Sequence, residues 1–288
     1  MSRLLLFLFC SLPAAAWAAE PLNWLLLPTP GVINLKQGEP DDGMALQLLR
    51  ALEPGLKQRG VQVGYELGNV ARLLQHLQQG RQLCSAVTLR SPERDRLALF
   101  VPLLAVPPMQ LVVRSADHAR VPLENGQVAW QALLDSDLRG AVYRQRIYPP
   151  ALLVSMQQAL KDGRLQSLTL SGNVDKHLLM LSHGRFDFTL EFPLVFSQVL
   201  RSGRLVAPLS LLPLTHLEQL DVAGSYCTRG PWGQRMAQRI DETLRELIQA
   251  QGLESLYQQW LPTDNYQAYQ LSIKAYLRER GLQPARLD

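Results

Sequence analysis

Short apolar runs alternate with stretches of helical spacing along the first half of the chain, which predicts strands and helices in turn. The expected elements are a strand over 22–27, a helix over 43–58, a strand over 61–67, a helix over 70–79 and a strand over 83–89. Strands that alternate with helices in this way are typical of an α/β fold built on a parallel sheet.

Polar residues near the helix ends sharpen two of these boundaries. Asn69 stands directly before one helix, where its side chain can accept a hydrogen bond from a free backbone N–H, and Gly80 follows that helix, where a left-handed turn needs no Cβ. Asp41 and Asp42 are expected to cap the helix over 43–58. These signals predict where the first two helices begin and where the second one ends.

The pattern restarts in the second half of the chain. The expected elements are a strand over 140–143, a helix over 150–160, a strand over 166–170, a helix over 174–182, a strand over 186–192 and a helix ending near 200. The segments 73–89 and 178–192 form a weak internal echo, because both run helix, Gly-Arg, strand and polar turn. In open α/β sheets ligands bind beyond the carboxyl ends of the strands, so two such lobes would face each other across a cleft.

Two extended runs connect the predicted halves. Met109–Arg114 leads into the second half and Val222–Cys227 leads back out of it, and both are expected to be crossings between the lobes. Helices over 232–251, 253–260 and 266–280 are expected to close the chain.

The first residues have the architecture of a secretory signal peptide. Arg3 precedes an apolar run over 4–12, and Ala16 and Ala18 offer a small-residue cleavage site. An uncleaved membrane anchor is the less favoured alternative, because the run is far shorter than the ~20 residues that span a bilayer. We therefore predict a cleavable signal peptide over residues 1–19.

A lipid anchor through Cys10 is a further alternative. Cys10 lies inside the apolar run, and Phe7-Leu8-Phe9 stand before it, where a lipoprotein has a small residue. No later stretch is long and apolar enough to predict a membrane span. We therefore expect an exported protein that works in the periplasm without a lipid anchor.

Composition and spacing argue against several classes of function. The formal net charge is +4, with scattered Lys and Arg, whereas a nucleic-acid-binding protein needs a clustered basic stripe. The histidines lack the spacing of a zinc site, and no Gly-x-Ser-x-Gly motif of a serine hydrolase is present. We therefore expect no nucleic-acid partner, no metal and no cofactor, and an enzyme is the less favoured class. The histidines are His76, His118, His177, His183 and His216.

Two cysteines remain after the expected cleavage. Cys84 and Cys227 are an even pair in an oxidising compartment, which favours a disulfide, and two buried free thiols are the alternative. A crosslink that closes so long a loop contributes at most roughly 4–5 kcal/mol in the chain-entropy model.

A series of loose motifs, taken in order and spacing, resembles the type II periplasmic solute-binding proteins, specifically the family-3 kind that serves amino-acid ABC importers. The resemblance covers about 22–262. The motifs are Gly43 at the start of a helix, Leu77-x-x-Gly80-Arg81, Thr88-x-x-Ser91-Pro92-Glu93-Arg94, Phe100-x-Pro102, the run Met109–Arg114, Leu138-x-Gly140, Gly184-Arg185-x-Asp187 and the stretch from Gly252 to Trp260-Leu261-Pro262.

The resemblance implies an α/β fold with two lobes, each a mostly parallel sheet flanked by helices, joined by two hinge crossings. It implies lobe one over 20–112 plus 225–288 and lobe two over 113–224. Cys84 and Cys227 would then both lie in lobe one, where a bridge leaves hinge closure free.

The resemblance also implies ligand-binding residues. Arg94 stands where the family binds the ligand carboxylate, a role that suits a planar, bidentate guanidinium, and Thr88 opens the same segment. A surface arginine paired with Glu93 or Asp95 is the alternative for Arg94. Glu191 is the nearest match to the acidic residue that holds the ligand's amino group.

The lobe-two turn departs from the family pattern. Its Gly/Ser/Thr-rich anion-binding segment is replaced by 144–150, which holds two arginines and a tyrosine, and we include Arg144 and Tyr148 among the candidate ligand contacts. Val87 and Leu89 also replace small and hydroxyl residues before Arg94. An acidic, peptidic or aromatic ligand is therefore favoured over a standard α-amino acid, and loss of small-molecule binding is the alternative.

The sequence thus predicts a monomeric periplasmic solute-binding protein. It would close around a small polar ligand, amino-acid-like or a related carboxylate, and deliver it to an inner-membrane ABC permease. The alternative is a sensory or accessory protein that signals to a membrane receptor.

Overall fold

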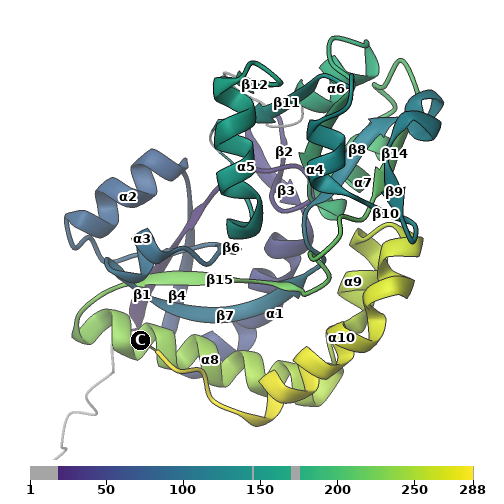
Figure 1. Ribbon diagram of the computed structural model, residues 1–288. Helices are drawn as coiled ribbons and strands as arrows, with labels where there is room; N and C mark the ends of the chain where they lie inside the picture. The colour runs from purple at the N-terminus through teal and green to yellow at the C-terminus, as the bar shows by residue number, and fades with distance from the viewer. Residues whose placement is uncertain (1–18, 145, 170–175, 288) are drawn as a thin grey trace, which may run out of the picture.

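The computed structural model describes residues 19–144, 146–169 and 176–287. The predicted signal peptide over 1–19, apart from residue 19, lies outside the described residues. The described chain forms two sheets, each with its own helices, one below the other in Figure 1. We call the part built on the first sheet lobe one and the part built on the second sheet lobe two. No helix of the described residues is long and apolar enough to cross a membrane.

The sheet of lobe one has six strands in the order β4-β1-β5-β15-β6, with β7 paired to β15. β1 runs parallel to β4 and β5, whereas β15 runs antiparallel to β5, β6 and β7. The strands are β1 (Glu20–Leu26), β4 (Val61–Leu67), β5 (Cys84–Ser85), β6 (Thr88–Leu89), β7 (Ala98–Val106) and β15 (Asp221–Thr228). Helices cover this sheet: α1 (Met44–Gln58), α2 (Val70–Gln78), the short α3 (Pro92–Asp95) and α8 (Pro231–Gln251).

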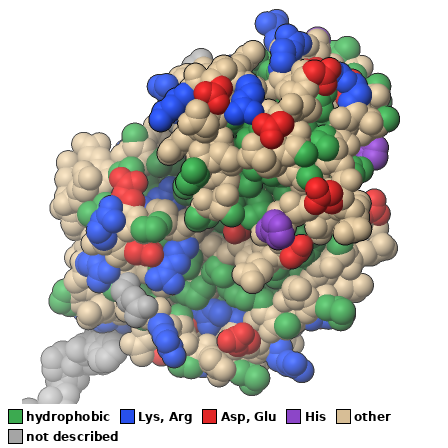
Figure 2. Space-filling model, viewed as in Figure 1, with side chains coloured by type: hydrophobic (Ala, Val, Ile, Leu, Met, Phe, Trp, Pro, Cys, Tyr) green, Lys and Arg blue, Asp and Glu red, His purple; other side chains and the backbone are tan. Residues whose placement is uncertain are grey.

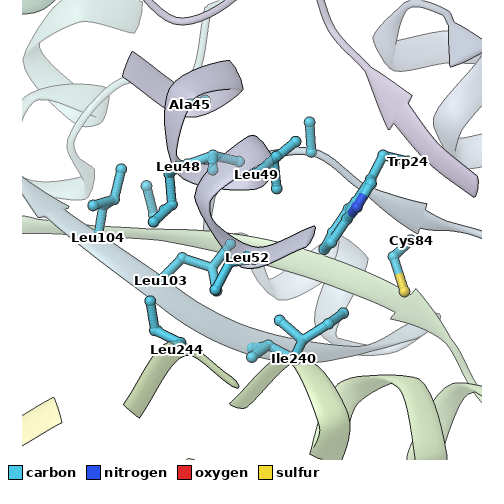
Figure 3. Packing of buried hydrophobic residues seen from close by; sticks show 14 of the residues in the cluster. Trp24, Ala45, Leu48, Leu49, Leu52, Cys84, Leu103, Leu104, Ile240 and Leu244 are labelled. Carbon is cyan, nitrogen blue, oxygen red and sulfur yellow. The ribbon is translucent and has the colours of Figure 1, made fainter. Parts of the chain in front are cut away.

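Strand β1 shows how alternation along the sequence builds this lobe. Leu22, Trp24 and Leu26 belong to the large core cluster with α1 and α8, whereas Leu25, on the opposite face, belongs to the cluster with α2. Successive side chains of a strand point to opposite faces, so one apolar run fills two cores. Figure 3 shows the larger core, in which side chains of α1, β7 and α8 meet.

The sheet of lobe two has the order β12-β11-β13-β8-β14. β11 runs parallel to β12 and β13, and β8 runs antiparallel to β13 and β14. The strands are β8 (Gln110–Arg114), β11 (Gly140–Tyr143), β12 (Leu165–Leu168), β13 (Phe188–Glu191) and β14 (Leu209–Leu212). The helices are α4 (Trp130–Leu134), α5 (Pro150–Lys161), α6 (Lys176–Ser182) and α7 (Pro193–Arg201).

The remaining elements are short hairpins and the C-terminal helices. They are β2 (Asn34–Lys36) with β3 (Glu39–Asp42), the 3-10 helix Ser115–Arg120, β9 (Leu123–Glu124) with β10 (Gln127–Val128), α9 (Glu254–Trp260) and α10 (Thr263–Leu282). α9 lies against lobe two, because Arg201 of α7 donates to the carbonyl of Gln259 at 3.1 Å.

The chain passes between the sheets at 107–109 and again at 213–220. The runs expected to be crossings, 109–114 and 222–227, are instead mostly strands inside the sheets, namely β8 and β15. The reason is burial: these runs are apolar, and Leu111, Val112 and Val113 fill both cores of lobe two.

Most predicted helices are found, but one predicted cap is wrong. Asn69 caps α2 as expected, with its side chain accepting from the N–H of Arg72 at 2.9 Å. The residue before α1 is Gly43, without a side-chain cap, and Asp42 ends β3 and accepts from Gln47. The hairpin formed by β2 and β3 thus uses the aspartates that sequence reasoning assigned to the helix.

Two strands differ from the sequence prediction. The strand expected over 83–89 is split into β5 and β6. The longer β7 was not predicted, because Pro102 interrupts its apolar pattern. β7 pairs only with β15, so it is an edge strand, where a missing N–H is tolerated. At the bulge opposite Pro102, a Cβ on Gly224 would lie 2.1 Å from the carbonyl oxygen of Val101, which only glycine avoids.

The predicted disulfide is confirmed. Cys84 of β5 and Cys227 of β15 are directly opposite residues on antiparallel strands and are bonded. The bridge joins residues 143 positions apart and ties the returning strand β15 into lobe one. Both cysteines lie in that lobe, as the resemblance implied.

Candidate functional site

A cleft of about 940 Å³ opens between the lobes, with walls from both. Lobe one contributes the loop after β1, the start of α2 and the segment from β6 to α3, and lobe two contributes the turn after β11 and helix α7. Figure 2 shows hydrophobic side chains in the recess between the two halves. The size falls within the roughly 300–1,000 Å³ that ligand pockets usually have.

Arg94 is the charged residue that lobe one presents to this cleft. It is only 4% exposed, yet no carboxylate of the described residues lies within ion-pair distance of its guanidinium. Its Nη1 donates to Thr88 Oγ1 at 2.9 Å and to the carbonyl of Leu89 at 3.0 Å. The alternative of a surface arginine paired with Glu93 or Asp95 is therefore not found among the described residues: Asp95 pairs with Arg90, and the charge of Glu93 acts on Arg94 from beyond ion-pair distance. Burial lowers the pKa of Arg94, as expected for a cation held away from water.

Tyr226 of β15 supports the segment that carries Arg94. Its ring lies 5.9 Å from the guanidinium of Arg94, and its hydroxyl accepts from the N–H of Ser91 at 2.7 Å and donates to Asp95 at 2.8 Å. Burial raises the pKa of Tyr226 to about 12, so the hydroxyl keeps its proton at neutral pH. The side chain of Ser91 in turn caps α3. The groups that accept hydrogen bonds from the Arg94 guanidinium are thus neutral.

Glu191 is fully buried at the end of β13, on lobe two. Its Oε2 pairs with Arg146 and lies 3.1 Å from Nε2 of His177, and its Oε1 accepts from the N–H of Phe192 at 2.7 Å. Burial alone would raise the pKa of Glu191, but the charge of Arg146 and the hydrogen bonds from His177 and the N–H of Phe192 outweigh it and hold the pKa below its usual range. The carboxylate is therefore ionised and already satisfied inside the protein, and Glu191 is not among the residues that line the cleft.

The other two candidates in lobe two lie outside the cleft wall. The hydroxyl of Tyr148 accepts from the N–H of Tyr143 at 2.7 Å and donates to its carbonyl at 3.1 Å, so it closes the turn after β11. Arg144 is exposed, and its backbone N–H donates to Leu168 at 3.0 Å. The structure thus brings Thr88 and Arg94 together at the cleft but places neither Arg144 nor Tyr148 on its wall.

Arg146 is one of two charged residues of the described lobe-two wall that the sequence analysis did not predict, the other being Arg204. It lines the cleft, its guanidinium lies 6.0 Å from the ring of Phe192, and its side chain is 12% exposed. Tyr143 also lines the cleft, and its ring stacks on His177 with centroids 6.4 Å apart. The sequence offered one signal, two arginines two positions apart in the turn. The pairing with Glu191, 45 residues later in the chain, distinguishes Arg146 from Arg144.

The charged side chains of the described cleft wall are all basic. The described wall residues include Arg94, Arg146 and Arg204 but no Asp, Glu, His or Cys, and most of the rest are apolar. No group of three or more His, Cys, Asp or Glu side chains suited to a metal is found among the described residues. The arrangement is able to hold an anion against an apolar surface.

Solved structures show which fold this is. One chain, from the study of glutathione import via GshT and the cystine ABC importer TcyBC of Streptococcus mutans, is 14% identical, with a TM-score of 0.65, over 84% of this chain and 97% of that chain. A putative L-cystine ABC transporter structure from Listeria monocytogenes is 17% identical, with a TM-score of 0.62, over 85% and 98%. A histidine kinase sensor domain similar to periplasmic binding proteins is 17% identical, with a TM-score of 0.62, over 84% and 96%.

These likenesses confirm the predicted architecture, the two-lobed α/β fold of type II periplasmic solute-binding proteins. Other similar structures include an ancestral arginine-binding protein and the substrate-binding protein of an amino-acid ABC transporter. No protein-family model matches the sequence, and no curated protein matches it.

Proposed function

We propose that this protein is a periplasmic solute-binding protein that closes around a small solute carrying an anionic group and delivers it to an ABC importer. The single observation that carries this proposal is Arg94, a buried guanidinium on the wall of an interlobe cleft, without a carboxylate partner among the described residues. A buried charge without a counter-charge is costly, and an anionic ligand would supply the missing partner.

The two-lobed arrangement supports a closing motion as the working step. We place the lobe boundaries where the chain passes between the sheets, near 107–109 and 213–220, so that 20–106 plus 221–287 form lobe one and 110–212 form lobe two. The boundaries expected at 112 and 224 fall inside β8 and β15. A solute held by Arg94 and by the lobe-two wall makes both sets of contacts only when the lobes are together. Binding therefore favours the closed form, which a permease or receptor would recognise. A monomer is sufficient for this mechanism.

A thermal-shift screen of amino acids, dicarboxylates and short peptides, followed by calorimetry on the hits, tests the proposal. Since each hydrogen bond to a charged group contributes about 1.5–3 kcal/mol, Arg94→Met should weaken binding about tenfold or more. Arg96→Met is the matched control, because Arg96 is exposed, lies two residues away and removes the same charge. A ligand that binds Arg94→Met as tightly as the wild type would refute the role of Arg94.

A sensory role is the second candidate. The likeness to a histidine kinase sensor domain supports it, because that domain uses the same fold to signal. Deleting the gene distinguishes the two roles. A transport protein predicts loss of uptake of the labelled ligand, and a sensory protein predicts intact uptake with loss of a ligand-dependent transcriptional response.

We propose no catalytic role. The described wall lacks the carboxylate, imidazole and thiol groups that enzymes use most often for proton transfer and nucleophilic attack. Recovery of an unchanged ligand from the purified complex would support binding without turnover.

A further inference from the structure

The charges around the cleft indicate more than the presence of an anion site. Arg94, Arg146 and Arg204 reach the described wall, and no acidic side chain does. A positively charged ligand group entering this cleft would meet the guanidinium of Arg94 and no carboxylate of the described wall, whereas a carboxylate could pair with Arg94. Like charges that approach each other in a desolvated site cost several kcal/mol, which makes the cleft selective against cations.

Glu191 is the carboxylate closest in sequence to the lobe-two wall, yet it is not available to a ligand. Arg146 and His177 share its Oε2, and the N–H of Phe192 occupies Oε1. The side chain has no exposed surface. Drawing Glu191 away to hold an ammonium group would leave the Arg146 charge without its partner, and breaking a buried pair in this way is strongly unfavourable.

The rest of the wall is suited to a hydrocarbon. Val87 and Leu89 flank Thr88 on lobe one, and Ile147 and Phe192 line the lobe-two side. Each Å² of apolar ligand surface removed from water against such side chains contributes to affinity. The wall therefore combines one open guanidinium with an apolar surface.

We propose that the cleft selects a carboxylate with an apolar body and no ammonium group, so that α-amino acids are excluded and alkyl or aryl carboxylates are accepted. This inference rests on the proposed solute-binding function and assigns its substrate class. The internal pair of Arg146 and Glu191 acts as the selectivity element, because it occupies the carboxylate that could otherwise pair with an ammonium group.

Calorimetry with matched pairs of ligands tests the inference. The probes are 3-phenylpropionate against L-phenylalanine, 4-methylpentanoate against L-leucine, and glutarate against L-glutamate, each pair differing by one amino group. We expect at least one of the two apolar carboxylates to bind at least about tenfold more tightly than its amino counterpart, because the ammonium would face the guanidinium of Arg94 and no carboxylate of the described wall.

The outcomes separate the two proposals. If the amino acids bind as well as their deaminated partners or better, the inference fails and the solute-binding function stands. If glutarate is the only carboxylate that binds, the proposed preference for a ligand with an apolar body is wrong. If the full screen of amino acids, dicarboxylates, peptides and these carboxylates gives no binding at all, both proposals fail.

Variants of the internal pair provide a second, independent test. Arg146→Met should uncover Glu191 and increase affinity for L-phenylalanine about tenfold, since a carboxylate then becomes available to the ammonium. The double variant Arg146→Met/Glu191→Gln removes the charges of both members of the pair, so it avoids the unpaired buried carboxylate of the single variant, and it should show no such gain. Equal affinity of both variants and the wild type for L-phenylalanine would show that the pair does not control selectivity.

Discussion

Two arginines face the same cleft from opposite lobes, and their partners make them different. Arg94 of lobe one is held by a hydroxyl and a carbonyl oxygen, both neutral, whereas Arg146 of lobe two is paired with the carboxylate of Glu191. Both side chains are largely buried. The comparison shows that the residue type and its position on the wall do not decide what a guanidinium offers to a ligand. The partner decides whether the charge is still available.

Stability measurements would give the largest contrast between the two arginines. Arg146→Met leaves Glu191 buried with one cationic partner fewer, so the free energy of unfolding should fall by about 3–5 kcal/mol. Arg94→Met removes a charge without a counter-charge together with two hydrogen bonds, and its net effect should stay within about 1 kcal/mol. Urea denaturation without ligand measures both. Equal losses in the two variants would mean that the two arginines have similar electrostatic surroundings.

The pH dependence of stability sharpens the same contrast. Since the pKa of Glu191 is below its usual range in the folded protein, its contribution to stability is present above the unfolded value, near 4.5, and is lost as the pH falls through the folded value. The advantage of the wild type over Glu191→Gln should shrink as the pH falls below about 5, by up to about 1.4 kcal/mol per pH unit.

Thermal melts of both proteins across this pH range provide the measurement. The difference between wild type and variant cancels the contribution of Asp187, whose pKa is also lowered. Because Arg94 has no carboxylate within ion-pair distance among the described residues, Arg94→Met should leave the loss of stability at acidic pH unchanged. A constant difference between wild type and Glu191→Gln down to pH 3 would contradict the ionised pair.

The smallest expected effects concern the tyrosines that hold each segment. Tyr226→Phe removes the hydroxyl contacts to Ser91 and Asp95 and should cost about 1 kcal/mol of stability and weaken ligand binding through Arg94. Tyr148→Phe is the matched change in lobe two, where the hydroxyl bonds only to the backbone of Tyr143. It should cost a similar amount of stability but leave ligand binding within about twofold, because no charge at the open site moves. Calorimetry that finds the same loss of affinity in both variants would contradict the assignment of Tyr226 to the support of Arg94.

The spacing of hydrophobic residues predicted much of the fold. It failed where tertiary contacts overrode a local sequence rule. The helices α1, α2, α5 and α8 begin and end within one or two residues of the predicted ranges. Strand β7 was missed because Pro102 argues against a strand, and only the edge position beside the bulge at Gly224 makes that proline acceptable. The aspartates before α1 form a hairpin strand, a pairing that a local capping rule does not consider.

The candidate site was predicted less completely. Arg94 and Thr88 lie together at the cleft, and their order in one short segment was enough to group them. In lobe two Arg144 was chosen, whereas Arg146 lines the cleft. Of these two arginines in one turn, Arg146 pairs with the carboxylate of Glu191, which lies on β13. That information lies in the packing of β13 against the turn and not in either segment alone.

The sequence by itself predicted the two-lobed α/β architecture and the bond between Cys84 and Cys227, and it made Arg94 a candidate. Periodicity indicates the alternating strands and helices, and the family resemblance, carried by a series of motifs in order, implies the two lobes, the shared lobe of the cysteines and the place of Arg94. The tertiary structure alone decided that Glu191 is neutralised internally and that Arg94 is not. The physical reason is that the strength of a charge in a protein depends on burial and on the few groups within about 4 Å, and those groups come from segments far apart in the chain.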